Sequence, residues 1–203
     1  VYKRQDLRGV KANTGNLIEG MEIKGTLGKL YAKADRIDLG KEIARLNKID
    51  LSDTAITLLM NDTTTNKDTT STAVNWKLML DQIDLDRVAF AMQIPGDSLR
   101  LSTYIDKAGL TDGIVDLGSA RYSASQFLLS GSSLSYDGSY SDPAPGFDPA
   151  HIALNDVNIR IDSLLYGGRD ISARIKKFSA NDRSGLTLSS LTGDISSDST
   201  TIQ

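Results

Sequence analysis

His151 is the only histidine in the chain, and there is no cysteine. A serine, cysteine or threonine nucleophile usually needs a histidine as its base, and one histidine cannot supply a typical zinc site. His151 follows Pro149 and Ala150 at the start of a strand-like pattern. We therefore interpret it as a structural or exposed residue, and we expect no catalytic residue, no metal and no cofactor.

Carboxylates are the other groups that could do chemistry. Asp50, Asp53, Asp84 and Asp86 recur beside the ends of alternating runs. Two of them facing each other across a cleft would suit a glycosidase. Aspartate is also favoured in turns and on solvent-facing strands. The chain has no phosphate loop, dinucleotide fingerprint or nucleophile elbow, so an Asp-based hydrolase is the least favoured hypothesis and we expect no enzyme.

The composition excludes several classes of partner. The net charge is −3, and the 23 lysines and arginines are scattered rather than clustered. Nucleic-acid binding needs a concentrated positive surface. Hydrophobic residues make up 39% of the chain, and no apolar run reaches the length of a membrane span. We expect a thin core with much exposed surface.

Alternation of apolar and polar residues predicts strands along most of the chain. A period of two residues places every second side chain on one face of a strand. No stretch shows a sustained helical period. The clearest alternating runs are Trp76, Leu78 and Leu80; Val88, Phe90, Met92 and Ile94; and Val157, Ile159 and Ile161.

The alternation is interrupted by steps of three residues, for example from Leu85 to Val88 and from Leu154 to Val157. A step of three reverses the phase of a strand, which bulges or short bends would explain. Repeated bending predicts a sheet that curls. The sequence alone does not decide whether Ile83 and Leu85 lie on the same face as Val88 after such a step.

Turn signals predict antiparallel neighbours. Gly167-Gly168 is a two-residue hairpin signal, Asp112-Gly113 and Asp137-Gly138 are similar, and Pro95-Gly96 fits a type II turn. Residues 61–75 and 137–150 are polar or proline-rich and predict loops between strand units. The expected fold is a single, mainly β unit over residues 1–203: an elongated, curled antiparallel sheet forming an open trough, with an apolar inner face and little or no helix.

A weak internal repeat runs through the chain. An apolar pair two residues apart is followed by a polar break with Asp and a second alternating run. Its copies begin at Ile49-Asp50-Leu51, Ile83-Asp84-Leu85 and Ile152-Ala153-Leu154, and Ile37-Asp38-Leu39 is a fourth candidate. Such repeats favour strand units stacked along one axis, although any β meander shares much of this pattern.

These segments resemble the TamB-like and AsmA-like envelope proteins of Gram-negative bacteria. The resemblance rests on the Ile-Asp-Leu segments, the run from Trp76 to Met92, and the stretches 146–154, 182–188 and 191–195. It implies a periplasmic segment of a longer protein that is anchored in the inner membrane. The resemblance also implies that the anchor and the family's C-terminal domain lie outside this fragment, which is expected to be monomeric by itself.

The resemblance implies that the trough conducts phospholipid between inner and outer membranes, supports outer-membrane protein assembly, or does both. An outer-membrane barrel protein would then be a partner of the missing C-terminal part. The alternative is a β-sandwich binding or adhesion module with a closed core, because alternation looks the same in both cases. The residues expected to line a lipid groove are Trp76, Leu78, Leu80, Val88, Phe90, Met92, Val157, Ile159 and Ile161.

Overall fold

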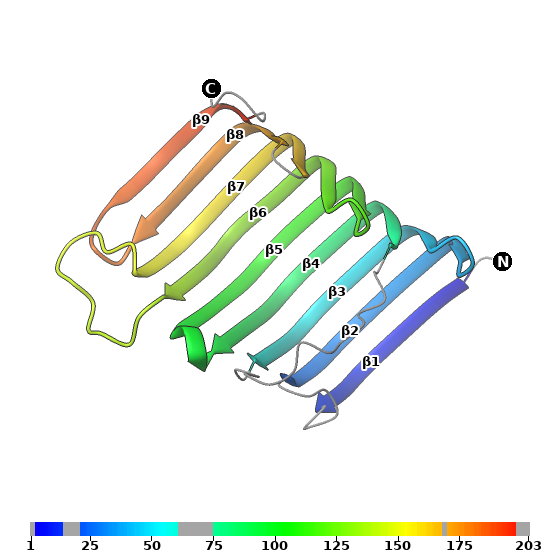
Figure 1. Ribbon diagram of the computed structural model, residues 1–203, viewed down its shortest axis with the longest axis horizontal. Coiled ribbons are helices and arrows are strands. Elements are labelled where there is room, and N and C mark those ends of the chain that lie inside the picture. Colours follow the sequence, from blue (N-terminus) through cyan, green and yellow to red (C-terminus); the bar gives the residue numbers. More distant parts are fainter. Residues whose placement is uncertain (1–2, 14–20, 61–74, 168–169, 198–203) are drawn as a thin grey trace.

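The computed structural model describes residues 3–13, 21–60, 75–167 and 170–197, and these form one nine-stranded sheet in sequence order (Figure 1). The sheet is not closed, and the described residues contain no α-helix. The expected curled, open, mainly β fold is confirmed. The strands are β1 (Lys3–Asn13), β2 (Met21–Asp38), β3 (Ile43–Met60), β4 (Lys77–Ile94), β5 (Leu99–Asp116), β6 (Arg121–Asp137), β7 (His151–Gly167), β8 (Asp170–Asp182) and β9 (Thr187–Ser197).

One pairing departs from the predicted antiparallel meander. β3 and β4 run parallel, with Ile49 beside Ile83 and Leu51 beside Leu85, whereas the other seven neighbouring pairs are antiparallel. A parallel pair needs a long connection that returns the chain to its starting end. The segment predicted as a loop at residues 61–75 occupies this junction, and all of it except Asn75 lies outside the described residues.

Two of the four predicted turns are wrong. Asp112-Gly113 lies inside β5, where Asp112 has a φ of 49° and marks a bend. Asp137 is the last residue of β6, and residues 138–150 form the connection to β7 in place of a tight hairpin.

The other two turn signals do mark antiparallel junctions. Pro95–Asp97 forms a single 3-10 turn between β4 and β5. Gly167 pairs with Asp170 across the β7–β8 junction. Residues 168 and 169 lie outside the described residues.

The three-residue steps coincide with bends in the strands. Asp53 and Arg87 lie opposite each other in β3 and β4, with φ of 52° and 53°. The neighbouring side chains of Asp86 and Arg87 contact each other, with Arg87 Nη1 2.6 Å from Asp86 Oδ1. Two consecutive residues therefore point to the same face, so Leu85 and Val88 both point to the other face. This settles the open question: Ile83 and Leu85 share the face of Val88 and Phe90.

The bends form two lines across the sheet. The first runs through Gly9, Asp53, Arg87, Gly131 and Asp156, all with positive φ, on five of the first seven strands. The second line lies nearer the opposite strand ends, at Asp112 of β5 and Ser163 of β7, whose φ values are 49° and 61°. Because the bends lie at corresponding positions on several strands, these strands bend together and the sheet curls (Figure 1).

The bend at Gly28 of β2 leaves no room for a side chain. A Cβ at Gly28 would lie 2.5 Å from the backbone oxygen of Asp53, whereas a Cβ at Gly193 would meet nothing within 4 Å. Gly28→Ala should therefore lower the free energy of unfolding by roughly 1–3 kcal/mol. Gly193→Ala should change it by no more than about 0.5 kcal/mol. Urea unfolding curves of both variants test this, and equal costs would contradict the steric account of the bend.

Candidate apolar trough

One face of the sheet carries an unbroken apolar row across all nine strands. Residues that face each other in a ladder point to the same side of the sheet. Following the pairings from β1 to β9, every residue in this row is aliphatic or aromatic. The row, called the central row below, is Leu7, Leu30, Leu51, Leu85, Ala108, Leu129, Ile159, Phe178 and Leu191.

Parallel rows widen this apolar face on both sides. On one side the row through Ile83 is apolar from β2 to β8: Ala32, Ile49, Ile83, Leu110, Phe127, Ile161 and Ile175. Beyond the first line of bends, another row is Ile23, Leu58, Met92, Leu101, Tyr136 and Ile152. The phase reversal at the bends keeps these rows on the same face as the central row.

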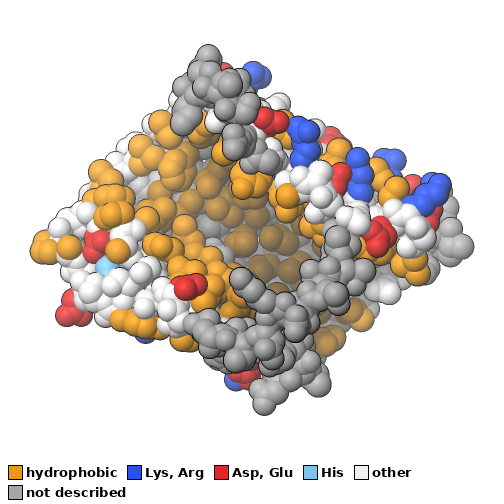
Figure 2. All heavy atoms as spheres, viewed as in Figure 1, with side chains coloured by type: hydrophobic (Ala, Val, Ile, Leu, Met, Phe, Trp, Pro, Cys, Tyr) orange, Lys and Arg blue, Asp and Glu red, His pale blue; other side chains and the backbone are white. Residues whose placement is uncertain are grey.

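The apolar face is the concave one. Figure 2 shows a hollow whose floor and walls are formed by hydrophobic side chains. Few of these side chains are fully covered, and those that are buried are mostly small or lie at the bends. The buried hydrophobic residues among those described are Ala34, Ala44, Leu80, Val88, Ala124, Val157 and Ala180. The larger apolar side chains are therefore left partly open along a trough.

The opposite face is polar and carries ion pairs. Lys48 Nζ lies 3.2 Å from Asp50 and 3.7 Å from Asp84, and Arg87 Nε lies 2.7 Å from Asp53. The guanidinium of Arg87 lowers the pKa of the Asp53 carboxyl through their hydrogen bond. Such exposed pairs add little stability. The convex face therefore suits contact with water, and among the described residues no second layer covers the trough.

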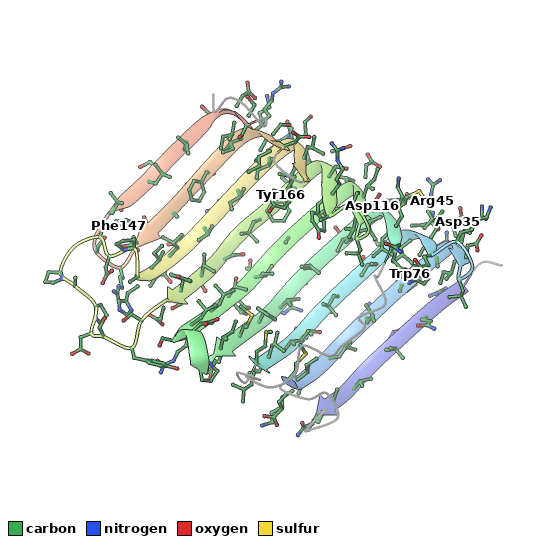
Figure 3. The ribbon with its side chains drawn as sticks, viewed as in Figure 1. Asp35, Arg45, Trp76, Asp116, Phe147 and Tyr166 are labelled. Carbon is green, nitrogen blue, oxygen red and sulfur yellow. The ribbon has the colours of Figure 1, made fainter. Side chains whose placement is uncertain are left out.

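Eight of the nine residues predicted to line a groove lie in β4 and β7, and Trp76 directly precedes β4. Leu80, Val88 and Val157 are buried at the bends. Met92, Ile159 and Ile161 are partly exposed members of the apolar rows, and Leu78 and Phe90 are partly exposed outside those rows. Trp76 precedes β4 and is half-exposed at the curled end of the sheet, opposite the end where Phe147 lies (Figure 3).

Sequence reasoning missed part of the trough, because all nine predicted residues came from β4, the residue before it and β7. A hollow of about 190 Å³ lies at β1–β3 and is lined by Val10, Ile23, Leu27 and Ile56, among others. Alternation in β1 is short and mixed with charges, so Val10 gave no clear signal in the sequence. The three-residue step from Leu7 to Val10 around Gly9, which has a φ of 61°, is the feature that could have revealed it.

A second cluster of chemical groups surrounds His151 where β6 ends and β7 begins. His151 faces Asp137 in the ladder, and its Nδ1 lies 3.0 Å from Asp137 Oδ1. Its Nε2 lies 3.4 Å from the Ser141 hydroxyl. Only 4% of His151 is exposed. The histidine is therefore enclosed by the 138–150 connection, and its two partners were not predicted from the sequence.

The 138–150 connection is fixed to the sheet by backbone hydrogen bonds. Gly138 donates to Ala150 O over 2.8 Å, and the His151 amide donates to Asp148 O over 3.1 Å. The Asp148 carboxylate accepts hydrogen bonds from the amides of Ala144 at 2.8 Å and Ala150 at 3.0 Å. These two amides, Ala144 first, lower the pKa of Asp148. The connection is thus a built loop that covers His151.

The fold and the site define a class of structure: a single-layer, open, curled β-sheet whose concave face is apolar across its full width. No protein-family model matches the chain, and no curated protein is detectably similar to it. No helix among the described residues is long and apolar enough to cross a membrane. The described residues also contain no group of three or more His, Cys, Asp or Glu side chains placed to hold a metal ion.

The Asp148 carboxylate predicts a pH-dependent contribution to stability. Because its pKa is lowered in the folded protein, its contribution is complete above the ordinary pKa of aspartate. It is lost as the pH falls through the lowered value. Asp148→Asn should therefore lower the urea midpoint at neutral pH and have a smaller effect in acid. The difference between wild-type and variant midpoints, measured against pH, checks this; a difference that grows in acid would rule out the carboxylate as the cause.

Proposed function

We propose that the trough holds the hydrocarbon chains of lipids. The observation that carries this proposal is the central row, which is apolar on all nine strands and ends in open edges at Leu7 and Leu191, 43% and 45% exposed. Hydrocarbon is the ligand that such a surface suits, because it needs apolar contact and no hydrogen-bond partners. The backbone groups beneath the row are already paired within the sheet.

The dimensions support this ligand. Strands in a sheet lie about 4.8 Å apart, so a row across nine strands is about 38 Å long. One leaflet of a bilayer has a hydrocarbon depth of about 15 Å. An acyl chain therefore fits along the row with length to spare. Burying each methylene is worth about 0.8 kcal/mol, so many weak contacts would hold the chain and no single side chain would dominate.

The parent protein in this proposal is a TamB-like or AsmA-like envelope protein. The trough would then be a periplasmic segment that conducts phospholipid between the two membranes, supports outer-membrane protein assembly, or does both. The anchor in the inner membrane and the contact with an outer-membrane barrel would belong to other parts of that protein. What supports this assignment is the repeat pattern together with the curled, open sheet.

The alternative of a closed β-sandwich requires a second sheet over the apolar face. The described residues form one sheet. The large apolar side chains Phe90, Met92 and Ile159 stay half-exposed rather than buried. A sandwich core would bury them, so the single layer favours the open trough.

Organic extraction of the purified protein, followed by mass spectrometry, tests for bound lipid. The proposal expects phospholipid to be recovered, and a fluorescent fatty acid to bind to the delipidated protein. Protein that yields no lipid and binds no fatty acid would count against the trough as a lipid site.

Phe90→Asp should abolish lipid binding while the protein still folds. The aspartate would place a charge among the apolar rows, and an open face tolerates polarity better than a closed core. Ile159→Asp, in the central row, should act in the same way. Binding of the fluorescent fatty acid, with circular dichroism as a check on folding, measures both variants.

Tyr104→Asp is the matched control for Phe90→Asp. Tyr104 pairs with Ala89, and Thr103 pairs with Phe90, so Tyr104 lies in the same region on the opposite face. It is 43% exposed, and its replacement should leave binding unchanged. If both trough variants unfold the protein, the apolar face is a closed core and the lipid proposal fails.

We also propose that His151 has a structural role. Asp137, His151 and Ser141 follow the order of groups in a serine nucleophile with its base, yet the same contacts fasten the loop to the sheet. His151→Ala should expose the loop to proteases and leave fatty-acid binding intact. Covalent labelling of Ser141 by a fluorophosphonate probe in the wild-type protein, lost in His151→Ala, would show instead that the cluster is an acyl-transfer site.

A further inference from the structure

The hollow of about 190 Å³ at β1–β3 owes its depth to small residues. It lies over the row that pairs Ala12 with Gly25 and Gly25 with Ile56. The same row continues from Ile56 to Phe90 of β4. Two neighbouring strands thus carry only a methyl group and a hydrogen atom where the next two carry large apolar side chains, and this difference leaves the depression.

Gly25 lies at the middle of the hollow, on the central one of its three strands. A Cβ at Gly25 would lie 3.2 Å from the backbone oxygen of Ala55 and 3.7 Å from Ile56 Cγ1, so any side chain there would take up part of the space. Ile23 and Leu27, two residues to either side of Gly25, also line the hollow. Three strands bound it, so it does not require the outer edge of β1 to be free.

The lining offers no polar group that needs a polar ligand. None of the residues that line the hollow carries a charge. The Thr54 hydroxyl already donates to Ser52 O over 3.0 Å. Thr26 pairs with Ala55, in a row that leads to Tyr104 on the opposite face of the sheet. Water needs several polar partners to occupy a cavity, so this lining suits hydrocarbon.

A larger hollow on the convex face has a different lining. Its volume is about 320 Å³, and the residues that line it include Ala89, Ser102, Tyr104 and Ser133. Tyr104 pairs with Ala89 and with Ser133, so these residues lie on the face opposite the trough. Several hydroxyl groups surround this hollow. Size alone therefore does not make a hydrocarbon site, and the convex hollow provides a matched comparison.

The volume of the hollow at Gly25 suits a compact hydrocarbon group. An apolar cavity of about 150 Å³ engineered in another protein stays dry and binds benzene. The hollow also adjoins the central row, since Leu27 in its lining is three residues from Leu30 of that row, with the bend at Gly28 between them. A chain lying along the central row would reach the hollow by crossing this bend.

We propose that the hollow at Gly25 is a distinct binding site for a compact hydrocarbon group, and that it holds the end of a chain lying in the trough. The assignment to a chain end rests on the proposed lipid binding, whereas the hydrocarbon site does not. Such a site gives the ligand a preferred position, because the apolar rows by themselves offer similar contacts on every strand.

Methyl NMR spectra recorded during a benzene titration test the site without any lipid. Benzene added to the delipidated wild-type protein should shift the methyl resonances of Ile23 and Leu27. Ala12→Leu should weaken this binding about tenfold, because the new side chain would displace contact with roughly two methylene-sized groups at about 0.8 kcal/mol each. Val10→Phe, which narrows the hollow from the same strand, should weaken it in the same way.

Ala89→Leu is the matched control, because it adds the same side chain to the hollow on the convex face. It should leave benzene binding unchanged. Ala12 is exposed and Val10 is 41% exposed, so both trough variants should fold, which circular dichroism checks. The site is overturned if benzene leaves the Ile23 and Leu27 methyl groups unmoved, or if both trough variants bind benzene as tightly as the wild type.

Dodecanoate tests the assignment to a chain end. Added to the wild-type protein, it should displace benzene from the hollow and so reverse the shifts that benzene causes. If dodecanoate binds while benzene stays in place, the chain end lies elsewhere and that part of the proposal is overturned. If benzene binds and dodecanoate does not bind at all, the lipid proposal fails and the hydrocarbon site remains.

Discussion

A bend that reverses the phase of a strand is the constraint on which this structure depends. A straight strand with an apolar step of three residues would point half of its apolar side chains to water. Here the residue within the step takes positive φ, as at Arg87, and the next residues return to the original face. For residues other than glycine this conformation costs roughly 1–2 kcal/mol. The ion pair of Arg87 with Asp53 and Asp86 opposes that cost at one of the bends.

The bends also determine where the sheet can be tightly packed. Thr54 and Ser132 lie beside the first line of bends and are 3% and 1% exposed. Their hydroxyls donate to the carbonyls of Ser52 and Ser130, two residues earlier. Short polar side chains thus satisfy backbone groups at these corners, beside the buried Val88 and Val157. The large apolar residues lie on the flanks between the corners, which is why they line a trough rather than fill a core.

Much of the fold could be predicted because alternation and its interruptions are local properties of the sequence. The steps at Leu85–Val88 and Leu154–Val157 each mark a bend. The parallel β3–β4 pair could not be predicted, since its direction depends on the path of the long 61–75 segment. The hairpin turn predicted at Asp112-Gly113 was wrong because the residue types that favour turns also favour the positive φ of a bend within a strand.

The sequence predicted an apolar face but not how far it extends. The nine expected groove residues came from the segments with the clearest alternation, and that they line a lipid groove stays a prediction. The central row was hidden because it combines one residue from each of nine strands, and only the pairing register aligns them. The partners of His151 were hidden for a related reason. Ser141 lies in an irregular connection, and no periodicity relates it to the histidine that it contacts at 3.4 Å.

The lipid proposal links the stability of the described sheet to whether a ligand is bound. The sheet has one layer, so the burial that usually stabilises a fold is incomplete along the central row. Any ligand that binds the folded sheet and not the unfolded chain raises its stability in proportion to the logarithm of ligand concentration. A hydrocarbon ligand would cover the same side chains that the bends hold open. In the lipid proposal, the ligand would therefore complete the burial that the described sheet leaves incomplete along the central row.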